Sequence, residues 1–370
     1  MKKVLFIIHN SLNKGGIQNV IMNIVRSLGN EYCFDGLVFS EEKGYYDDEF
    51  ISFGGKLIKK QFNFKLFDLR KINFYIRGYF IYKIIKKTIL LHGPYTVIHC
   101  HIADESGIAL WVAYRNGIPI RIVHSHIAFE RKYNLIAKIY TYLLQKMVFK
   151  YATNMVGCSK IACENLFKNH RYEVIYNTID KKFFYSIVNH NIRTQPYLLQ
   201  VGTFSKNKNQ LFSIEVLKYL KEYYPGSHLI FIGSYKNQEM ELYFKELQRI
   251  VMINNLNDSV KFLPSDIDVV NEMNEADYLL FPSQYEGLGI VPIEAQSMGM
   301  KCFVSDSVPH DINCGGCIFL SLSKGAKEWA NYIYKQFTYD NGKREKYDMT
   351  KFSNDIIMSQ YRKLYNGEMI

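Results

Sequence analysis

The 370-residue sequence lacks any long uninterrupted run of apolar residues. A membrane-spanning helix needs about 18 such residues, so the sequence does not predict an integral membrane protein. Its apolar start, Val4–Ile8, is too short for the core of a secretory signal and is typical of a buried first strand. Hydrophobic residues still make up 48% of the chain, which excludes a disordered protein.

The sequence has few cysteines, and their spacing does not suggest a disulfide framework. The seven cysteines are odd in number and scattered, which fits a reduced cytoplasmic protein. Cys314 and Cys317 have CxxC spacing, but no second pair exists to complete a zinc ribbon. Phosphate-binding sequences of the GxxxxGK[ST] and GxGxxG types are also absent.

Positive charge is in excess, with 46 Lys and Arg against 35 Asp and Glu and a net charge of +11. Fourteen basic residues lie in two stretches, 59–87 and 131–150, which contain one acid, Asp68, and many aromatic residues. This composition suits an anionic membrane surface, so we expect the N-terminal domain to bind one. Solvated faces over an ordinary core, or nucleic acid, are the alternatives, but no nucleic-acid-binding motif accompanies the charge, and none is expected as a partner.

Short apolar runs alternate with helical-period segments along the whole chain, which predicts an α/β fold of parallel, doubly wound sheets. The pattern begins at Val4–His9 and restarts at Tyr197–Val201, after an irregular polar segment. We therefore predict an N-terminal domain over 1–190, a C-terminal domain over 191–350 and a last helix over 351–370. Folds of this type bind ligands at the carboxyl ends of their strands, in a cleft.

Two glycine-containing loops are candidate phosphate sites. Gly15 and Gly16 precede a predicted helix, where backbone N–H groups and the helix dipole favour an anion. An ordinary strand-to-helix turn is the alternative. Farther along, Glu286 lies in a glycine-rich loop and Glu294 in the helix after it, where carboxylates can accept hydrogen bonds from sugar hydroxyls.

Glu286 and Glu294, with the glycine-rich loop and the predicted helix that carry them, resemble the E-x7-E motif of family-4 glycosyltransferases. These are retaining enzymes of GT-B fold that use nucleotide-sugars. The resemblance continues through motifs in the family's order, which are Gly15-Gly16, Gly157-Cys158-Ser159-Lys160, Tyr176-Asn177-Thr178-Ile179-Asp180, Val201-Gly202 to Lys208-Asn209, Phe281-Pro282-Ser283-Gln284-Tyr285-Glu286-Gly287 to Ala295-Gln296, and Phe303-Val304-Ser305-Asp306. It covers nearly the whole chain and is similar to capsule and exopolysaccharide members. It implies two Rossmann-like domains facing a central cleft, with the C-terminal helix packing back on the N-terminal domain.

The resemblance also implies roles for individual residues. Glu286, His126 and Lys208 would be catalytic, with Glu286 and His126 near the donor sugar and Lys208 on the diphosphate. Glu294 would bind the ribose of the nucleotide. The substrate-binding residues it implies are Gly15, Gly16, Gly202, Thr203, Gly287, Leu288, Gly289, His124 and Glu294.

Two positions depart from the family's pattern. Thr203 replaces the usual Arg after the Val-Gly pair, so one of two expected phosphate cations is missing, and Lys206 is a candidate substitute. Thr178 replaces the Gly of the Asn-Gly-Ile-Asp motif, a milder change in a loop.

Two pairs of histidines, His99 with His101 and His124 with His126, end predicted strands. We expect His126 to face the donor sugar and His124 to point to the opposite side. Paired histidines also suit zinc, but no acidic ligand is patterned with them, so we predict no metal. The metal signature Asp-x-Asp at Asp266 and Asp268 precedes a short helix and is predicted to be a cap.

The sequence thus predicts a metal- and cofactor-independent hexosyl or N-acetylhexosaminyl transferase. Its donor would be a nucleotide-sugar, expected to carry UDP, and its acceptor a lipid-linked saccharide in capsule or exopolysaccharide synthesis. We expect it in the cytoplasm, peripheral at the inner face of the membrane. The alternatives are a sugar-nucleotide epimerase and a non-catalytic GT-B partner subunit.

Overall fold

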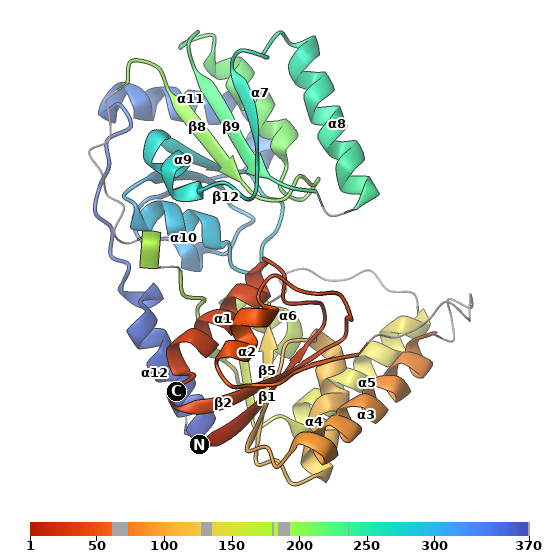
Figure 1. Ribbon diagram of the computed structural model, residues 1–370. Coiled ribbons are helices and arrows are strands. Elements are labelled where there is room, and N and C mark those ends of the chain that lie inside the picture. Colours follow the sequence, from red (N-terminus) through yellow and green to blue (C-terminus); the bar gives the residue numbers. More distant parts are fainter. Residues whose placement is uncertain (61–72, 127–134, 180, 184–192, 236, 369–370) are drawn as a thin grey trace. The chain divides into compact units, whose positions relative to one another are not determined.

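The computed structural model describes residues 1–60, 73–126, 135–179, 181–183, 193–235 and 237–368 (Figure 1). The chain divides into two compact units. The N-terminal unit comprises Met1–Thr178 and Phe352–Ile370, and the C-terminal unit comprises Ile179–Lys351.

The N-terminal unit alternates strands and helices. Its strands are β1 (Lys2–Ile8), β2 (Tyr32–Val38), β3 (Leu57–Lys59), β4 (Val97–Cys100), β5 (Ile120–Ser125), β6 (Asn154–Gly157) and β7 (Glu173–Val174). Its helices are α1 (Gly16–Leu28), α2 (Asp47–Ser52), α3 (Asn73–His92), α4 (Ser106–Arg115), α5 (Leu135–Tyr151), α6 (Lys160–Phe167) and α12 (Asn354–Asn366), with a 3₁₀ turn, η1, at Ala103–Glu105.

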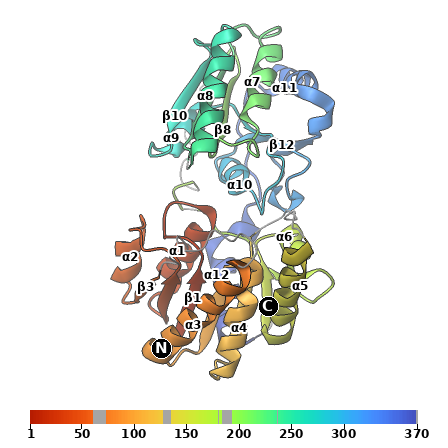
Figure 2. The same ribbon diagram turned by 90° about the vertical axis from the view of Figure 1, so that its right-hand side faces the viewer.

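The seven strands form one parallel sheet in the order β3-β2-β1-β4-β5-β6-β7. Successive residues of β1 enter different cores because side chains alternate along a strand. Val4 and Phe6 pack with α1 and α12, whereas Leu5 and Ile7 pack on the other face with α3, α4, α5 and α6. Figure 2 shows this layered arrangement of helices and sheet.

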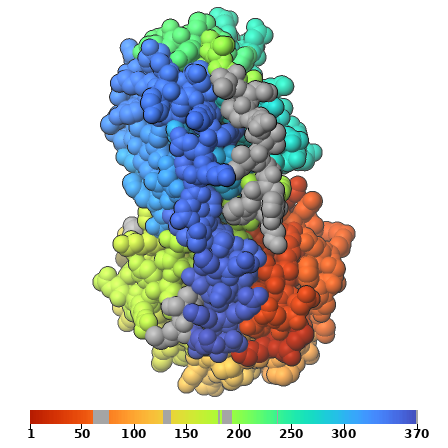
Figure 3. All heavy atoms as spheres, turned by 90° about the vertical axis from the view of Figure 1, so that its left-hand side faces the viewer, coloured from red at the N-terminus to blue at the C-terminus, as the bar shows by residue number. Residues whose placement is uncertain are grey.

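Helix α12 belongs to the N-terminal unit although it ends the chain. Its apolar side chains Ile357, Met358, Tyr361, Leu364 and Tyr365 are buried in the core that also holds Phe6 and Phe34. Figure 3 shows α12, in blue, lying against the red N-terminal segment. The prediction that the last helix packs back on the N-terminal domain is confirmed.

The C-terminal unit repeats the same architecture. Its strands are β8 (Tyr197–Val201), β9 (His228–Gly233), β10 (Val260–Pro264), β11 (Tyr278–Phe281), β12 (Lys301–Ser305) and β13 (Cys317–Leu320). Its helices are α7 (Gln210–Leu220), α8 (Gln238–Ile253), α9 (Val269–Glu275), α10 (Ile290–Ser297) and α11 (Gly325–Asp340). Short 3₁₀ turns lie at Lys181–Phe183, His310–Ile312 and Leu322–Lys324. A further 3₁₀ turn, Thr350–Phe352, spans the boundary at which the chain returns to the N-terminal unit.

These six strands are also parallel, in the order β10-β9-β8-β11-β12-β13. One core cluster joins α7, α8 and α11 to the sheet, and α9 and α10 contact β8, β11 and β12. Two doubly wound parallel sheets confirm the predicted α/β class. No helix in the described part of the chain is both long enough and apolar enough to cross a membrane.

The packing of α12 can be tested by truncating Leu364, whose side chain is fully buried. Leu364→Ala should lower the free energy of unfolding of the N-terminal unit by about 2–4 kcal/mol, because it removes apolar contacts and leaves a cavity. The measurement is urea unfolding followed by circular dichroism. The neighbouring Lys363 is exposed, so Lys363→Ala should change stability by no more than about 0.5 kcal/mol. Equal effects of the two variants would contradict the described packing.

Candidate active site

The C-terminal sheet has a topological switch point between β8 and β11. Strand order runs outward from this pair in both directions, so the loops that follow β8 and β11 diverge and leave a crevice at the carboxyl ends of the strands. The loop after β8 carries Gly202, Thr203 and Lys208, and the loop after β11 carries Glu286. The fold therefore brings two separate sequence motifs to one place.

Lys208 and Glu286 form an ion pair across this switch point. Lys208 Nζ lies 2.5 Å from Glu286 Oε1, and the two side chains are only 19% and 13% exposed. The Lys208 ammonium also lies over the Phe281 ring, 5.1 Å from its centroid. A half-buried cation held by one carboxylate and one aromatic face can meet an incoming anion with little rearrangement.

Asn207, which the sequence analysis did not single out, fastens the two loops together. Its Nδ2 donates to the carbonyl oxygen of Tyr285 at 3.1 Å, and its Oδ1 accepts from the Tyr285 N–H at 3.2 Å. The Asn207 carbonyl oxygen also accepts from the Gln284 N–H at 2.9 Å. Three bonds from one residue therefore fix the segment that leads into Glu286.

Gly202 is required where the chain leaves β8. Its φ of +153° is one that residues with a Cβ rarely adopt, and a Cβ there would meet the side-chain carbons of Lys208 at 3.4–3.6 Å. Thr203 is half-buried, and its carbonyl oxygen accepts from Gln210 Nε2 at 2.9 Å. Lys206 is exposed. Lys206 thus lies on the loop without sharing the enclosed position of Lys208.

Helix α10 begins directly after the Glu286 loop. Gly289 is its N-cap residue, with a φ of +96°, and Leu288 beside it is buried. Gly287 and Glu294 are half-buried, and Glu294 lies within α10. The positive end of the α10 dipole therefore begins four residues after Glu286. The helix dipole and the Lys208 ammonium both favour a bound anion.

The N-terminal sheet has its own switch point, between β1 and β4. Gly16 opens α1 in the loop region after β1, and a Cβ there would meet no described atom within 4 Å beyond its chain neighbours and the backbone of its own helix. A Cβ on Gly15 would meet only the movable Gln18 side chain closely, at 2.7 Å from its Oε1. The described protein does not itself require glycine at position 16, which favours a role in close approach of a ligand.

The four predicted strand-end histidines lie together on β4, β5 and the residues after them. His99 Nε2 lies 3.3 Å from His124 Nδ1, and His101 Nδ1 lies 2.9 Å from His126 Nε2. The rings of His124 and His126 stack, with centroids 4.1 Å apart. The expectation that His124 points to the opposite side from His126 is wrong, because residues two apart in a strand share a face.

Burial disfavours the charged form of these imidazoles. It lowers the pKa of His126 to about 3 and holds the pKa values of His99, His101 and His124 well below the usual range. Ring nitrogens of His99, His101 and His124 lie within 4.8 Å of one another, which makes them the one group with metal-ligand density among the residues that the structure describes. Because nitrogens of both pairs already bond ring to ring, metal independence stays our prediction.

Two sequence features have structural explanations. Asp268 caps α9, its side chain accepting from the Val270 N–H at 3.1 Å, as predicted. Cys314 lies in the bend before β13 and Cys317 is the first residue of that strand, and none of the seven cysteines forms a disulfide bond. The motif residue Asp180 lies outside the described residues.

Comparison with known proteins now adds to this geometry. The sequence model of the family described as Glycosyl transferases group 1 matches residues 185–311, which include Lys208, Glu286 and Glu294. Residues 185–311 thus carry a group 1 glycosyltransferase domain, within a chain of GT-B fold. The resemblance to family-4 glycosyltransferases is confirmed.

Similar glycosyltransferases occur in several bacteria. The chain is 26% identical to EpsF of Bacillus subtilis over 364 residues, covering 93% of this chain and 90% of that one. It is 28% identical to the capsular polysaccharide biosynthesis glycosyltransferase CapH of Staphylococcus aureus, covering 80% and 79% of the two chains. The UDP-Gal:alpha-D-GlcNAc-diphosphoundecaprenol alpha-1,3-galactosyltransferase of Escherichia coli is 25% identical, over 82% and 78%.

A solved structure confirms the GT-B fold. HepE from Anabaena, in complex with UDP and glucose, superposes with a TM-score of 0.72 at 16% identity, covering 99% of this chain and 98% of that one.

The histidine cluster of this glycosyltransferase predicts a dependence of stability on pH. An unfolded histidine has a pKa of about 6.5, and the folded values are lower, so below about pH 6.5 the unfolded chain binds protons that the folded chain does not. Unfolding free energy should therefore fall between about pH 7.5 and pH 5, by at most about 1.4 kcal/mol per pH unit for each histidine.

Urea unfolding at the two pH values measures this effect. His124→Phe should remove part of the pH dependence, whereas His228→Asn, at an exposed position of β9, should not. Stability that is the same at both pH values would contradict the buried, neutral state of the cluster.

Proposed function

We propose that this glycosyltransferase is a retaining, metal-independent hexosyl or N-acetylhexosaminyl transferase. It takes the sugar from a UDP-sugar and passes it to a lipid-linked saccharide in capsule or exopolysaccharide synthesis. The observation that carries the proposal is the enclosed Lys208–Glu286 pair at the switch point of the group 1 domain.

The pair suits the departure of a nucleoside diphosphate. Breaking a glycosyl–phosphate bond places new negative charge on the diphosphate, which needs a cation and N–H dipoles more than an acid. Lys208 supplies the cation, and the start of α10 supplies the dipole. Glu286, released from Lys208 by the phosphate, accepts hydrogen bonds from the donor sugar, and Glu294 accepts from the ribose. The UDP complex of HepE supports UDP as the nucleotide.

The acceptor enters on the N-terminal unit in this proposal. Gly15 and Gly16 leave the start of α1 open to a phosphate group, and His126 contacts a sugar hydroxyl. The leaving phosphate accepts the proton of the acceptor hydroxyl, so no separate protein base is needed. The names of CapH and of the E. coli galactosyltransferase support a lipid-linked saccharide acceptor and polysaccharide synthesis.

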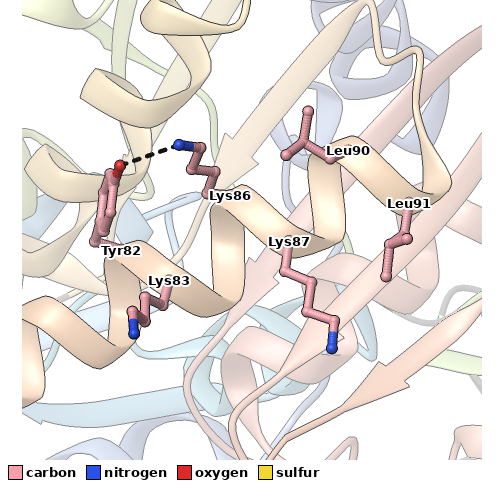
Figure 4. Close-up of a pocket in the computed structure, with 6 residues that line it drawn as sticks. All are labelled: Tyr82, Lys83, Lys86, Lys87, Leu90 and Leu91. Atoms are coloured by element: carbon pink, nitrogen blue, oxygen red, sulfur yellow. Dashed lines mark hydrogen bonds between the residues drawn. The ribbon is translucent and has the colours of Figure 1, made fainter.

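Helices α3 and α5 support a membrane location for the acceptor. On α3, Lys83, Lys86 and Lys87 line a surface groove with Tyr82, Leu90 and Leu91 (Figure 4). Leu90 and Leu91 are 66% and 64% exposed, so apolar side chains and cations share this surface. Lysines beside exposed leucines suit anionic headgroups above an apolar interior.

The outer face of α5 is apolar as well. Exposed apolar residues recur there at helical spacing, namely Leu135, Ile136, Ile139, Tyr142 and Leu143. A surface helix in water normally turns polar residues outward, so this stripe marks a binding face. Lys138 and Lys146, also exposed on α5, favour an anionic partner. We assign the surface formed by the named residues of α3 and α5 to peripheral binding at the inner membrane face.

Not all of the basic sequence is available for this purpose. Lys59 pairs with Asp47 and donates to the carbonyl oxygen of Glu42 at 2.8 Å, so it serves the fold. Residues 61–72 and 131–134 of the two basic stretches lie outside the described residues.

Donor turnover tests the site assignment. Lys208→Ala and Glu286→Ala should each lower turnover of the UDP-sugar by about a hundredfold or more, because each removes charge or hydrogen bonding that the transition state uses. Turnover is measured as UDP release with an acceptor lipid extract. Lys218→Ala, at an exposed lysine of α7, is the charge-matched control.

Undiminished turnover by either site variant would contradict the assignment. Conversion of the donor sugar without any acceptor would instead favour the epimerase alternative.

Vesicle binding tests the membrane surface. Replacing Lys83, Lys86 and Lys87 by alanine should weaken binding to phosphatidylglycerol vesicles on the order of a hundredfold, at about 1 kcal/mol for each cation. A matched variant loses three exposed lysines of the C-terminal unit, Lys218, Lys327 and Lys335. Sedimentation of both with vesicles makes the comparison, and equal losses would contradict a dedicated surface.

A further inference from the structure

The two histidine pairs form a ladder at the carboxyl edge of the N-terminal sheet. Ring-to-ring hydrogen bonds join His99 to His124 and His101 to His126. The rings of His124 and His126 stack, and those of His99 and His101 lie tilted against each other with centroids 4.3 Å apart. His101 and His126 each follow the last residue of their strands, β4 and β5. They therefore lie at the edge where parallel sheets bind ligands, whereas His99 and His124 lie one step deeper.

The unpaired nitrogens decide the direction of these bonds. His101 Nε2 and His124 Nε2 are buried and have no hydrogen-bond partner. A buried N–H without an acceptor is rarer and more costly than a bare acceptor atom, so both nitrogens are unprotonated. A neutral imidazole carries one proton, which must then be on Nδ1 in both rings.

From this it follows which atom of His126 meets a ligand. His101 Nδ1–H donates to His126 Nε2 across 2.9 Å. His126 accepts at Nε2, so its own proton is on Nδ1. The second pair follows the same rule: His124 Nδ1–H donates to His99 Nε2, and His99 Nδ1–H donates to the hydroxyl oxygen of Tyr365 at 3.0 Å.

We propose that His101 is a positioning residue, which holds His126 in the tautomer that presents Nδ1–H to a substrate oxygen. His126 then acts as an uncharged hydrogen-bond donor, which suits a sugar hydroxyl oxygen. His99, His101 and His124 are buried and His126 is half-buried, and desolvation lowers the pKa of each ring, which agrees with this role. The identity of the ligand rests on the proposed function, but the tautomer does not.

Nuclear magnetic resonance of the full chain labelled with ¹⁵N-histidine tests the proposal directly. Long-range ¹H–¹⁵N spectra identify the tautomer, and the signals of His126 are assigned by their loss in His126→Gln. The expected result is the Nδ1–H form in the unaltered protein and in His101→Asn, whose amide replaces the donor. His101→Leu should give a mixture of forms.

Kinetics provide the second measurement. His101→Leu should lower kcat/KM for the UDP-sugar at least tenfold with unchanged affinity for UDP, which has no sugar, and His101→Asn should restore most of the loss. His99→Asn is the matched control, since His99 is equally buried on the same strand but does not bond His126. It should keep the His126 tautomer and stay within about threefold in kcat/KM.

An Nε2–H form of His126 in the unaltered protein would overturn the proposal, even if His101→Leu fails to fold. Unaltered tautomer and kinetics in a folded His101→Leu would overturn it too. If the unaltered chain turns over no nucleotide-sugar while the tautomer behaves as expected, the proposed function fails and the positioning role of His101 stands.

Discussion

Parallel strand pairing is the constraint on which the rest of this structure depends. Every described strand pairs in parallel, so all strands of a sheet end at the same edge. Each connection must cross back over the sheet, which places helices on both faces and loops at the carboxyl edge. In the C-terminal unit, Lys208 and Glu286 lie in loops that follow strands, and in the N-terminal unit His101 and His126 follow strands directly. In each unit, strand pairing therefore gathers the candidate residues at one edge of the sheet.

The chemistry proposed for the donor rests on a cation that is held but not fully buried. Glu286 and Phe281 confine Lys208, and Asn207 keeps the two loops in register. A carboxylate partner stabilises the ammonium before substrate arrives and competes with the phosphate afterwards. Thr203 in place of the family's usual Arg leaves Lys208 as the enclosed cation of this loop. The pair therefore carries more of the proposed donor recognition here than two cations would.

Much of the fold could be predicted from the sequence because fully buried parallel strands are continuously apolar. Tyr278–Phe281 is one such strand, and its position and the helix after it follow from pattern alone. The Asp268 cap was also predictable, since an acid before a short helix has one common use.

The pairing of side chains far apart in the chain was not predictable in the same way. Lys208 and Glu286 are 78 positions apart, and only the resemblance to a family connected them. The error on His124 was avoidable, because alternation within a strand already places it beside His126. Charge and aromatic content singled out residues 131–150, but they did not show which face of α5 is turned outward. Helical spacing reveals an apolar face but not whether that face meets a core or a membrane.

The central claim is that Lys208, and not general positive charge, holds the nucleotide diphosphate. Calorimetric titration of the full chain with UDP, comparing Lys208→Met with Glu286→Gln, tests it most directly. UDP lacks the sugar that Glu286 is proposed to bind, and Glu286→Gln releases the Lys208 ammonium from its competing carboxylate. The account therefore predicts that Lys208→Met weakens UDP binding by at least about tenfold, as expected for loss of a charge-assisted contact, while Glu286→Gln keeps or strengthens it. Unchanged UDP affinity in Lys208→Met, or no UDP binding by the unaltered chain, would contradict the account.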